Sequence, residues 1–408
     1  MTNTRMARRV AAAAEGHLVC ATGCSIMTTT TAEFIYDPST ARFQDELWDV
    51  YRVLRDDHPV YRHPVTGTYA LSRFDDVWRA VHDHDSFSSV VAEAENLLPQ
   101  MIYFDPPRHT AMRALVSRAF TPKRVAAVEG LVRQTARELC LEIAERGECE
   151  LQHEFAAILP SVVIARMIGV PDEHVPSFRT WTDSFLEIQG PQDFVEAAGK
   201  IYALFAELLT ERRARPRDDL MTALVDAEAD GTKLSDDELL GFCLLLILAG
   251  NDTTSSLIGT GIALLSQHAD QRALLVADPS RWPNAIEELN RIESPTQVLP
   301  RTTTRPVEMY GTTIPADSRV MLIWGAANHD DREFANPEAL DVTRKFSRHL
   351  AFGHGIHYCL GANLARLEAR AAFEEWHRQF PEYHLTGKPQ RIVSIWARAY
   401  SRIPVAVG

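Results

Sequence analysis

The sequence lacks an uninterrupted, charge-free apolar stretch of the length that a membrane helix needs. Its longest charge-free apolar run extends from Leu239 to Gly250, whereas a membrane helix needs roughly 18 or more such residues. Three arginines near the N-terminus precede a short apolar run, but Glu15 interrupts that run earlier than in a secretory signal peptide. We therefore expect a cytoplasmic protein without a membrane anchor, in which residues 1–32 form a disordered N-terminal tail.

Positive charge is also in short supply. The 408 residues include 42 Lys and Arg against 55 Asp and Glu, which gives a net charge of −13 at pH 7. Binding to nucleic acid needs clustered Lys and Arg, because contacts with the phosphates supply much of the affinity. The charge balance therefore argues against a nucleic-acid partner.

Cysteines are few and irregularly spaced. The six of them, at positions 20, 24, 140, 149, 243 and 359, do not show the spacing of a disulfide framework. His17, Cys20 and Cys24 could supply three metal ligands, but without a second cluster this is a weak pattern. For a lone cysteine, the usual outcome is a buried free thiol.

The sequence also has no internal repeat and no linker rich in glycine, serine or proline. Residues 45–56 and most of 107–270 have helical spacing, with breaks at Gly169–Pro171, Gly190–Pro191 and Pro216. Strand patterns are confined to a hairpin over 60–71 and a patch over 307–324. The pattern predicts one domain over residues 33–408, mainly α with small β-sheets.

One glycine-rich segment carries a cysteine and is the most informative part of the chain. It reads Phe-Gly-His-Gly-Ile-His-Tyr-Cys-Leu-Gly from Phe352 to Gly361 and leads into a helix predicted over 362–380. The unpaired N–H groups and the positive dipole end of that helix favour a thiolate at Cys359. Gly353 and Gly355 permit a tight backbone bulge, and Gly361 leaves room for a flat group near the backbone.

This segment resembles the haem-binding signature of the cytochrome P-450 superfamily, in which Phe, Gly, Cys and Gly stand at fixed spacing. Phe352, Gly355, Cys359 and Gly361 match all four positions. The resemblance implies a haem b cofactor, with Cys359 as the thiolate ligand of the iron and Phe352 and Gly361 beside the macrocycle. It also implies the superfamily's fold, with the haem between a long central helix and the helix after the cysteine loop.

A long helix is predicted upstream of this loop. Ser235 and Glu238 form a capping-box pattern, and the helical pattern continues to about Gln267. Its middle is almost wholly apolar, which in a water-soluble protein indicates burial on all sides. After Gly250 comes a run of small polar residues, and both glycine and Ser or Thr weaken a helix locally.

This weak point also resembles a motif of the same superfamily. Ala249 to Thr254 follows the distal pattern Ala/Gly-Gly-x-Asp/Glu-Thr-Thr, in which an opened turn makes a groove for dioxygen. By that resemblance, Ala249 and Gly250 contact the cofactor, while Asp252 and Thr253 are the catalytic residues that deliver protons. Activation of dioxygen inside an apolar pocket requires such a proton supply.

Glu288 and Arg291 stand three residues apart on a predicted helix, where they can form an ion pair. As an exposed pair they would contribute only a few tenths of a kcal/mol. Within this order of motifs they match the superfamily's Glu-x-x-Arg, which implies a structural pair that supports the cysteine loop. Ala339, after Pro337-Glu338, stands where many members have an arginine that completes the network, so the third partner is not identified.

Haem propionates are anions and need hydrogen-bond donors or cations as partners. Four residues resemble the superfamily's propionate ligands: His109 and Arg113, one helical turn apart, Arg301 in an extended segment, and His357 in the cysteine loop. Each of them alone would more often be a solvated surface group. As a set, they predict a binding site for the propionates.

Together these motifs imply a monooxygenase that activates dioxygen and hydroxylates an apolar organic substrate. By the same resemblance, a separate ferredoxin and its ferredoxin reductase supply the electrons. Alternatives on the same fold are a peroxygenase and a phenol-coupling enzyme, and a non-catalytic haem sensor would keep Cys359 without needing Asp252 and Thr253.

The substrate and the docking surface are less well defined. Pocket residues by family position are Leu97, Leu98, Ile102, Phe185, Leu186, Ile188, Leu246, Ala249, Val298 and Trp396, each of which could equally pack in the core. Two groups of basic residues could form a docking patch for an acidic ferredoxin: Arg118, Lys123 and Arg124, and Arg344, Lys345 and Arg348.

Overall fold

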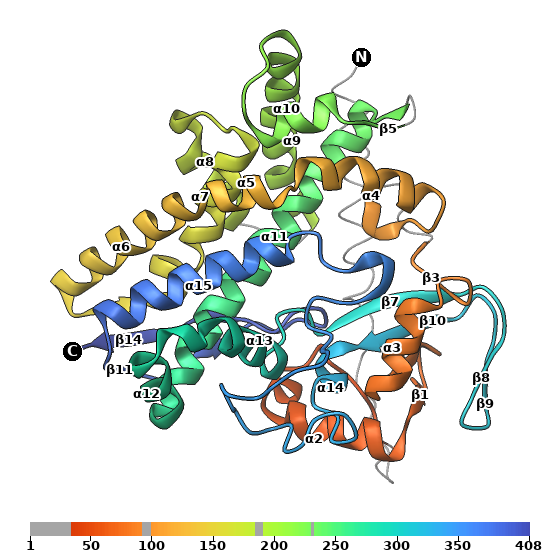
Figure 1. The fold of residues 1–408 in the computed structure, drawn as a ribbon. Coiled ribbons are helices and arrows are strands. Elements are labelled where there is room, and N and C mark those ends of the chain that lie inside the picture. Colours follow the sequence, from red (N-terminus) through yellow and green to blue (C-terminus); the bar gives the residue numbers. More distant parts are fainter. Residues whose placement is uncertain (1–33, 92–98, 184–190, 230–231) are drawn as a thin grey trace.

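A computed structural model describes residues 34–91, 99–183, 191–229 and 232–408, so the predicted tail over 1–32 lies outside the described part. Helices dominate, and the strands form small sheets near the periphery of the helical part (Figure 1). The predicted fold class, mainly α with small β-sheets, is therefore confirmed.

The helices run in this order. The first are α2 (Ala41–Asp57), α3 (Phe74–His82), α4 (Arg108–Ala119), α5 (Pro122–Ala127) and α6 (Glu129–Arg146). They are followed by α7 (Ile158–Ile168), α8 (Val175–Asp183), α9 (Pro191–Ala214), α10 (Leu220–Asp226) and α11 (Asp236–Gln267). The last are α12 (Ala269–Ala277), α13 (Trp282–Ile292), α14 (Trp324–Ala327) and α15 (Ala362–Gln379).

The largest sheet has five strands in the order β1 (Val60–Arg62), β2 (Tyr69–Leu71), β10 (Arg319–Ile323), β7 (Val298–Thr303) and β3 (Phe87–Ser88). Only the β2–β10 pair is parallel. A three-stranded sheet joins β11 (Tyr383–Leu385), β14 (Pro404–Val407) and β4 (Glu148–Glu150). The two-stranded pairs are β5 (Glu228–Ala229) with β6 (Thr232–Lys233), β8 (Val307–Met309) with β9 (Thr312–Ile314), and β12 (Gln390–Arg391) with β13 (Tyr400–Arg402).

Apolar side chains on both faces of the five-stranded sheet pack against helices. Successive side chains of a strand point to opposite faces, so one strand can contribute to two apolar clusters. On β10, Val320 and Leu322 belong to one apolar cluster with Phe74 of α3, whereas Ile323 belongs to another with Tyr51 of α2. The sheet is thus held between α3 and α2. β7 therefore runs through a packed layer, and its Arg301 is nearly buried.

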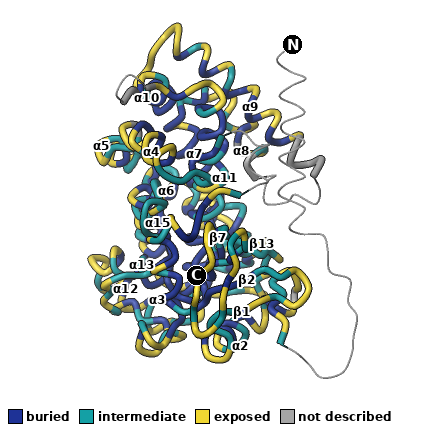
Figure 2. Tube along the Cα trace, turned by 90° about the vertical axis from the view of Figure 1, so that its right-hand side faces the viewer, coloured by how far each residue is buried: buried dark blue, intermediate teal, exposed yellow. Residues whose placement is uncertain are grey.

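The helical half is built around α11, which crosses it from end to end (Figures 1 and 2). The predicted capping box is present: the Ser235 hydroxyl accepts from the Glu238 N–H, and the Glu238 carboxylate accepts from the Ser235 N–H. By length and composition α11 could cross a membrane, but 61% of its apolar window is buried inside the protein. Its apolar character is that of a core helix, packed between α7 and α15.

The sequence patterns located most elements, but they were wrong about one detail of α11. The helix continues without a break through Ala249–Thr254, where an opened turn was expected. The Thr253 hydroxyl donates to the Ala249 carbonyl at 2.7 Å, and this local bond is compatible with an unbroken helix. Gly250 instead serves close packing, because a Cβ there would lie 3.0 Å from Ile164 Cδ1 of α7.

Candidate functional site

The cysteine loop folds as its glycines predict. Gly353 and Gly355 have positive φ angles of 64° and 68°, which favour glycine. A Cβ on Gly355 would lie 2.4 Å from the Val81 carbonyl oxygen of α3, so no other residue fits there. The Cys359 N–H donates to the Phe352 carbonyl at 2.9 Å, which closes the loop just before α15.

Two opposing effects act on the Cys359 thiol. Burial raises its pKa, whereas a hydrogen bond from the Gly361 backbone and the charges of Arg113 and Arg366 lower it. The net direction is upward, so the helix terminus alone does not produce the thiolate that was predicted from its position. A bound metal ion would do so, because coordination deprotonates a thiol.

An ion-pair cluster that was not predicted holds the loop to the neighbouring helices. Arg366 of α15 donates to both carboxylate oxygens of Glu287 of α13 at 2.6 and 2.9 Å, and His349 Nε2 lies 2.8 Å from Glu287. The same guanidinium lies over the Phe352 ring, 4.3 Å from its centroid. The spacing of Arg366, about two helical turns after Cys359, could have suggested a supporting role.

Glu288 and Arg291 form the predicted ion pair, and both are fully buried. The two bonds between them measure 2.8 and 2.9 Å. Arg291 also donates to the Asn328 carbonyl, and Asn328 Oδ1 accepts from the Leu350 N–H at the start of the cysteine loop. The pair therefore supports that loop through one intermediate residue.

The third partner in the Glu288–Arg291 network is Arg344, which lies five residues beyond Ala339, the position that the family resemblance indicated. Its Nε lies 3.1 Å from Glu288 Oε1, and its other nitrogens donate to backbone carbonyls, including that of Ala339 itself. The irregular chain between Ala339 and Arg344 turns so that the Arg344 guanidinium contacts the Glu288 carboxylate. Spacing alone could not indicate that path.

The four predicted propionate ligands come together from three separate segments. The rings of His109 (α4) and His357 (cysteine loop) are 4.3 Å apart, and Arg113 of α4 donates to the Tyr358 carbonyl at 2.7 Å. Arg301 of β7 is close enough to lower the pKa of His357, which burial and neighbouring positive charge bring to about 3. His357 is therefore a neutral donor or acceptor, and its Nε2 lies 2.9 Å from the Ser89 hydroxyl.

Two of these four side chains have polar atoms that could still bind the two propionates. Arg301 is 5% exposed, and burial lowers the pKa of its guanidinium to about 10. Among the described residues, the one hydrogen bond of that guanidinium goes to the Pro300 carbonyl. His109 is 2% exposed, and neither ring nitrogen has a partner among the described residues. A Cβ on Gly361 would meet nothing within 4 Å. Buried donors with unused hydrogen-bonding capacity fit a cofactor with two carboxylates, and the open space at Gly361 fits a flat one.

Arg301 therefore offers a test of this fit. We expect Arg301→Met to weaken haem retention by about 1.5–3 kcal/mol, the usual contribution of a charged hydrogen bond. The haem-free protein should not lose stability, because the buried charge is uncompensated there. Haem content after gel filtration and thermal unfolding of the haem-free protein would measure the two effects, with the exposed Arg402→Met as control. A loss of stability without a loss of haem would contradict the assignment.

One face of α11 is open, although the rest of the helix is buried. Leu245, Leu246, Ala249, Asp252 and Thr253 are half-buried or exposed, and their spacing of three to four residues places them on one side. The two predicted catalytic residues thus share this face with the predicted cofactor contact Ala249. Asp252 Oδ1 accepts from Asn251 Nδ2 at 3.3 Å, and Asn251 is held by the Ser161 hydroxyl at 2.8 Å.

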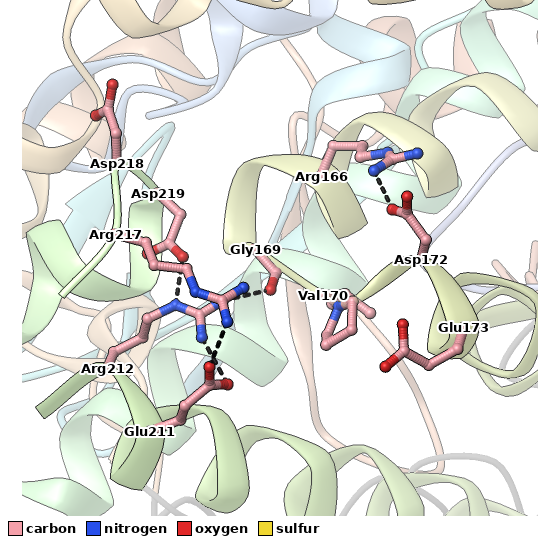
Figure 3. A pocket seen from close by; sticks show the side chains of 11 residues that line it. Arg166, Gly169, Val170, Asp172, Glu173, Glu211, Arg212, Arg217, Asp218 and Asp219 are labelled. Carbon is pink, nitrogen blue, oxygen red and sulfur yellow. Dashed lines mark hydrogen bonds and ion pairs between the residues drawn. The ribbon is translucent and has the colours of Figure 1, made fainter. Parts of the chain in front are cut away.

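Two hollows open elsewhere on the surface of the described chain. One, of about 620 Å³, lies among α7, α9 and α10 and is lined by charged side chains that pair with one another, such as Arg212 with Glu211 and Asp219 (Figure 3). The other, of about 430 Å³, is lined by residues 90–91, 99–100 and 103–108. The second adjoins Asp105, whose charge raises the pKa of Arg301, so it borders the predicted propionate site.

The predicted pocket residues have different environments. Leu97, Leu98, Phe185, Leu186 and Ile188 lie outside the described residues. Val298 is buried in the core beside α2, so its packing role is sufficient to explain it. Ile102, Leu246 and Trp396 are half-buried, and Ala249 is exposed.

The predicted docking patch loses three of its cations to internal pairs, the first of which joins Arg124 to Asp218 at 3.6 Å. Arg344 belongs to the Glu288 cluster, as described above. Arg348 pairs with Glu333 at 2.8 Å and with Asp75 at 3.0 Å, so its charge is neutralised locally. Lys345 between them is exposed.

Comparison with known proteins agrees with this arrangement. The family model described as Cytochrome P450 matches residues 175–275 and 283–382. Cytochrome P450 130 of Mycobacterium tuberculosis is 38% identical over 392 residues, which cover 90% of this chain and 96% of that protein. Vitamin D(3) 25-hydroxylase of Pseudonocardia autotrophica is 36% identical, covering 93% and 98%.

Solved structures give the same result. Cytochrome P450 CYP109Q5 from Chondromyces apiculatus superposes with a TM-score of 0.86 at 35% identity, covering 91% of this chain and 98% of that one. The Bacillus subtilis cytochrome P450 PksS superposes with a TM-score of 0.87 at 30% identity, covering 92% and 100%. The chain therefore belongs to the cytochrome P450 family, and it is a haem b oxidoreductase whose iron a cysteine thiolate binds.

Proposed function

We propose that this chain is a monooxygenase that hydroxylates an apolar organic substrate, with electrons supplied by a separate ferredoxin and its reductase. One observation carries the proposal: Asp252 and Thr253, an acid and an alcohol, lie together on the open face of α11. A haem-binding protein without turnover has no need of this pair. Residues 33–408 would form one catalytic domain, located in the cytoplasm.

The bound haem supplies the site for dioxygen activation, with electron density donated by the thiolate. Cys359 is the residue we assign as that ligand, since its loop is closed by the bond to Phe352 and supported by the Glu287 and Glu288 clusters. His109, Arg113, Arg301 and His357 would hold the two propionates.

Asp252 and Thr253 have the contacts that a proton relay needs. The chain from Ser161 through Asn251 fixes one oxygen of Asp252, which orients the carboxylate while it stays partly exposed. The Thr253 hydroxyl donates to the Ala249 carbonyl and can accept a hydrogen bond on its lone pairs. Rotation of the hydroxyl about its Cβ–Oγ1 bond would redirect its hydrogen from the carbonyl to a group over the open face.

Thr253→Ala tests this relay. We expect the product formed per dioxygen consumed to fall by about 10²-fold, the low end of what a positioned proton donor contributes. Cys359 should still give the thiolate spectrum, because the substitution does not touch the loop. Thr253→Ser keeps the hydroxyl and should restore most of the coupling. Coupling that is unchanged in Thr253→Ala would argue against the relay.

The names of the relatives guide the choice of substrates. One relative is a vitamin D(3) 25-hydroxylase, and the structure of Bacillus megaterium CYP109E1, 30% identical to this chain, was solved in complex with testosterone. The half-buried apolar residues Ile102, Leu246 and Trp396 suit such molecules. A titration of steroids, secosteroids, terpenes and fatty acids, followed by the spin-state shift of the haem, would identify the class. If no compound of this set shifted the spin state, the result would contradict an apolar substrate.

A further inference from the structure

Two histidines from distant parts of the chain meet on the outside of the cysteine loop. His82 is the last residue of α3, and His354 lies in the loop between Gly353 and Gly355. His82 Nε2 and His354 Nδ1 are 2.8 Å apart, and the two rings are tilted by 44° with their centroids 4.7 Å apart. No residue of the haem site described above takes part in this contact.

The hydrogen bonds define which nitrogens carry protons. His82 Nδ1 lies 2.6 Å from the Trp78 carbonyl, which can only accept, so Nδ1 carries the hydrogen. His82 Nε2 therefore presents a lone pair to His354, whose Nδ1–H donates to it. An ion would bind both nitrogens once that hydrogen has moved to Nε2 of His354, the other tautomer of the neutral ring. A backbone carbonyl bonded to the second ring nitrogen is the same support that fixes metal-binding histidines in proteins.

The positions of the two rings suit a shared ion. Two Zn–N bonds of about 2.0–2.1 Å at a tetrahedral angle place the nitrogens about 3.3–3.4 Å apart, roughly half an ångström more than here. His82 is exposed at a helix end and can supply that movement. His354 is held more firmly, because the Trp78 ring lies 4.0 Å from it and Gly355 packs on the Val81 carbonyl.

The surrounding charges do not oppose a cation. Arg348 is the positive side chain near His354, and it is neutralised by Glu333 and Asp75. On α3 itself, Arg79 pairs with Asp76 at 2.6 Å. Burial also lowers the pKa of His354, which keeps its imidazole in the neutral form that a metal requires.

We propose that His82 Nε2 and His354 Nδ1 form a binding site for a divalent transition-metal ion such as Zn²⁺, with water molecules as the other ligands. The described residues hold no group of three or more metal-ligating side chains, so the site has two protein ligands and its ion exchanges with solution. A bound ion would join the end of α3 to the cysteine loop. The proposal does not depend on the monooxygenase function.

Zinc binding to the holoenzyme, without an affinity tag, tests the site. Isothermal titration with ZnCl₂ should show a site that His82→Gln and His354→Gln each weaken by at least about tenfold. Glutamine keeps a hydrogen-bonding amide but is a poor zinc ligand, and His384→Gln, at an exposed histidine of β11, should change nothing. A parallel protein with His17, Cys20 and Cys24 replaced would account for zinc bound by the N-terminal segment.

A second measurement uses chemical modification of the unaltered holoenzyme. Zn²⁺ should protect His82 and His354 of the unaltered holoenzyme from carbethoxylation, as read by peptide mass spectrometry, while His384 stays reactive. It should also raise the unfolding midpoint of the holoenzyme and not that of either glutamine variant. Zinc affinity unchanged in both variants, or in one of them, would overturn the proposal, as would modification of the pair at the same rate with and without zinc.

Discussion

Cys359→Ser is expected to abolish the thiolate spectrum and the monooxygenase turnover. A serine hydroxyl is a much weaker ligand for ferric iron than a thiolate, and it does not donate the electron density that favours O–O cleavage. The reduced carbon monoxide complex should therefore lose the red-shifted Soret band. The loop itself should persist, because its closing bond uses the backbone N–H of residue 359 and the Phe352 carbonyl.

A matched control is available in the same chain. Cys140 is buried in α6, and burial raises its pKa to about 12, so it is an inert thiol in an apolar core. Cys140→Ala should keep the spectrum and the turnover of the unaltered protein. A thiolate-type carbon monoxide spectrum in Cys359→Ser would refute the ligand assignment, whatever its effect on activity.

Glu288→Gln is expected to be the most destabilising single substitution away from the haem. The two carboxylate oxygens of Glu288 accept hydrogen bonds from Arg291, from Arg344 and from the Asp341 N–H, and no donor–acceptor distance among these bonds exceeds 3.1 Å. An amide keeps one acceptor and turns an NH₂ toward these donors, which leaves the fully buried Arg291 without its counter-charge. Removing one partner of a buried pair costs about 3–5 kcal/mol, and we expect a loss of that size.

Urea unfolding, followed by far-UV circular dichroism and by the Soret band, would measure this loss. The Soret signal should disappear at a lower urea concentration than the helical signal, because the cluster supports the loop through Asn328 and Leu350. Glu196→Gln removes an exposed pair with Lys200 and should leave both transitions unchanged. Identical transitions for Glu288→Gln and the unaltered protein would show that the cluster does not support the loop.

Local sequence signals were reliable where the physical cause is local. The capping box of α11, the glycines of the cysteine loop and the start of α15 each depend on neighbours a few residues apart, and all were located correctly. The Glu288–Arg291 pair was found for the same reason, since both residues face one side of a single turn.

Signals that depend on the path of the chain were missed or misplaced. Arg344 reaches Glu288 only because an irregular segment turns back on itself, so the spacing to Ala339 was misleading. Glu287 meets Arg366 and His349 from three separate segments. The pKa of the Cys359 thiol also required the structure, because burial raises it against the effect of the helix terminus, and burial depends on the folded chain.

The gathering of donors around His109, Arg113, Arg301 and His357 has a consequence for the cell. Two guanidinium groups and two imidazoles from α4, β7 and the cysteine loop are brought together with no carboxylate paired to either arginine in the described chain. A ligand that binds only the folded chain shifts the folding equilibrium by mass action. The steady-state amount of this protein should therefore follow haem supply, falling when haem synthesis is limited even though transcription and translation are constant.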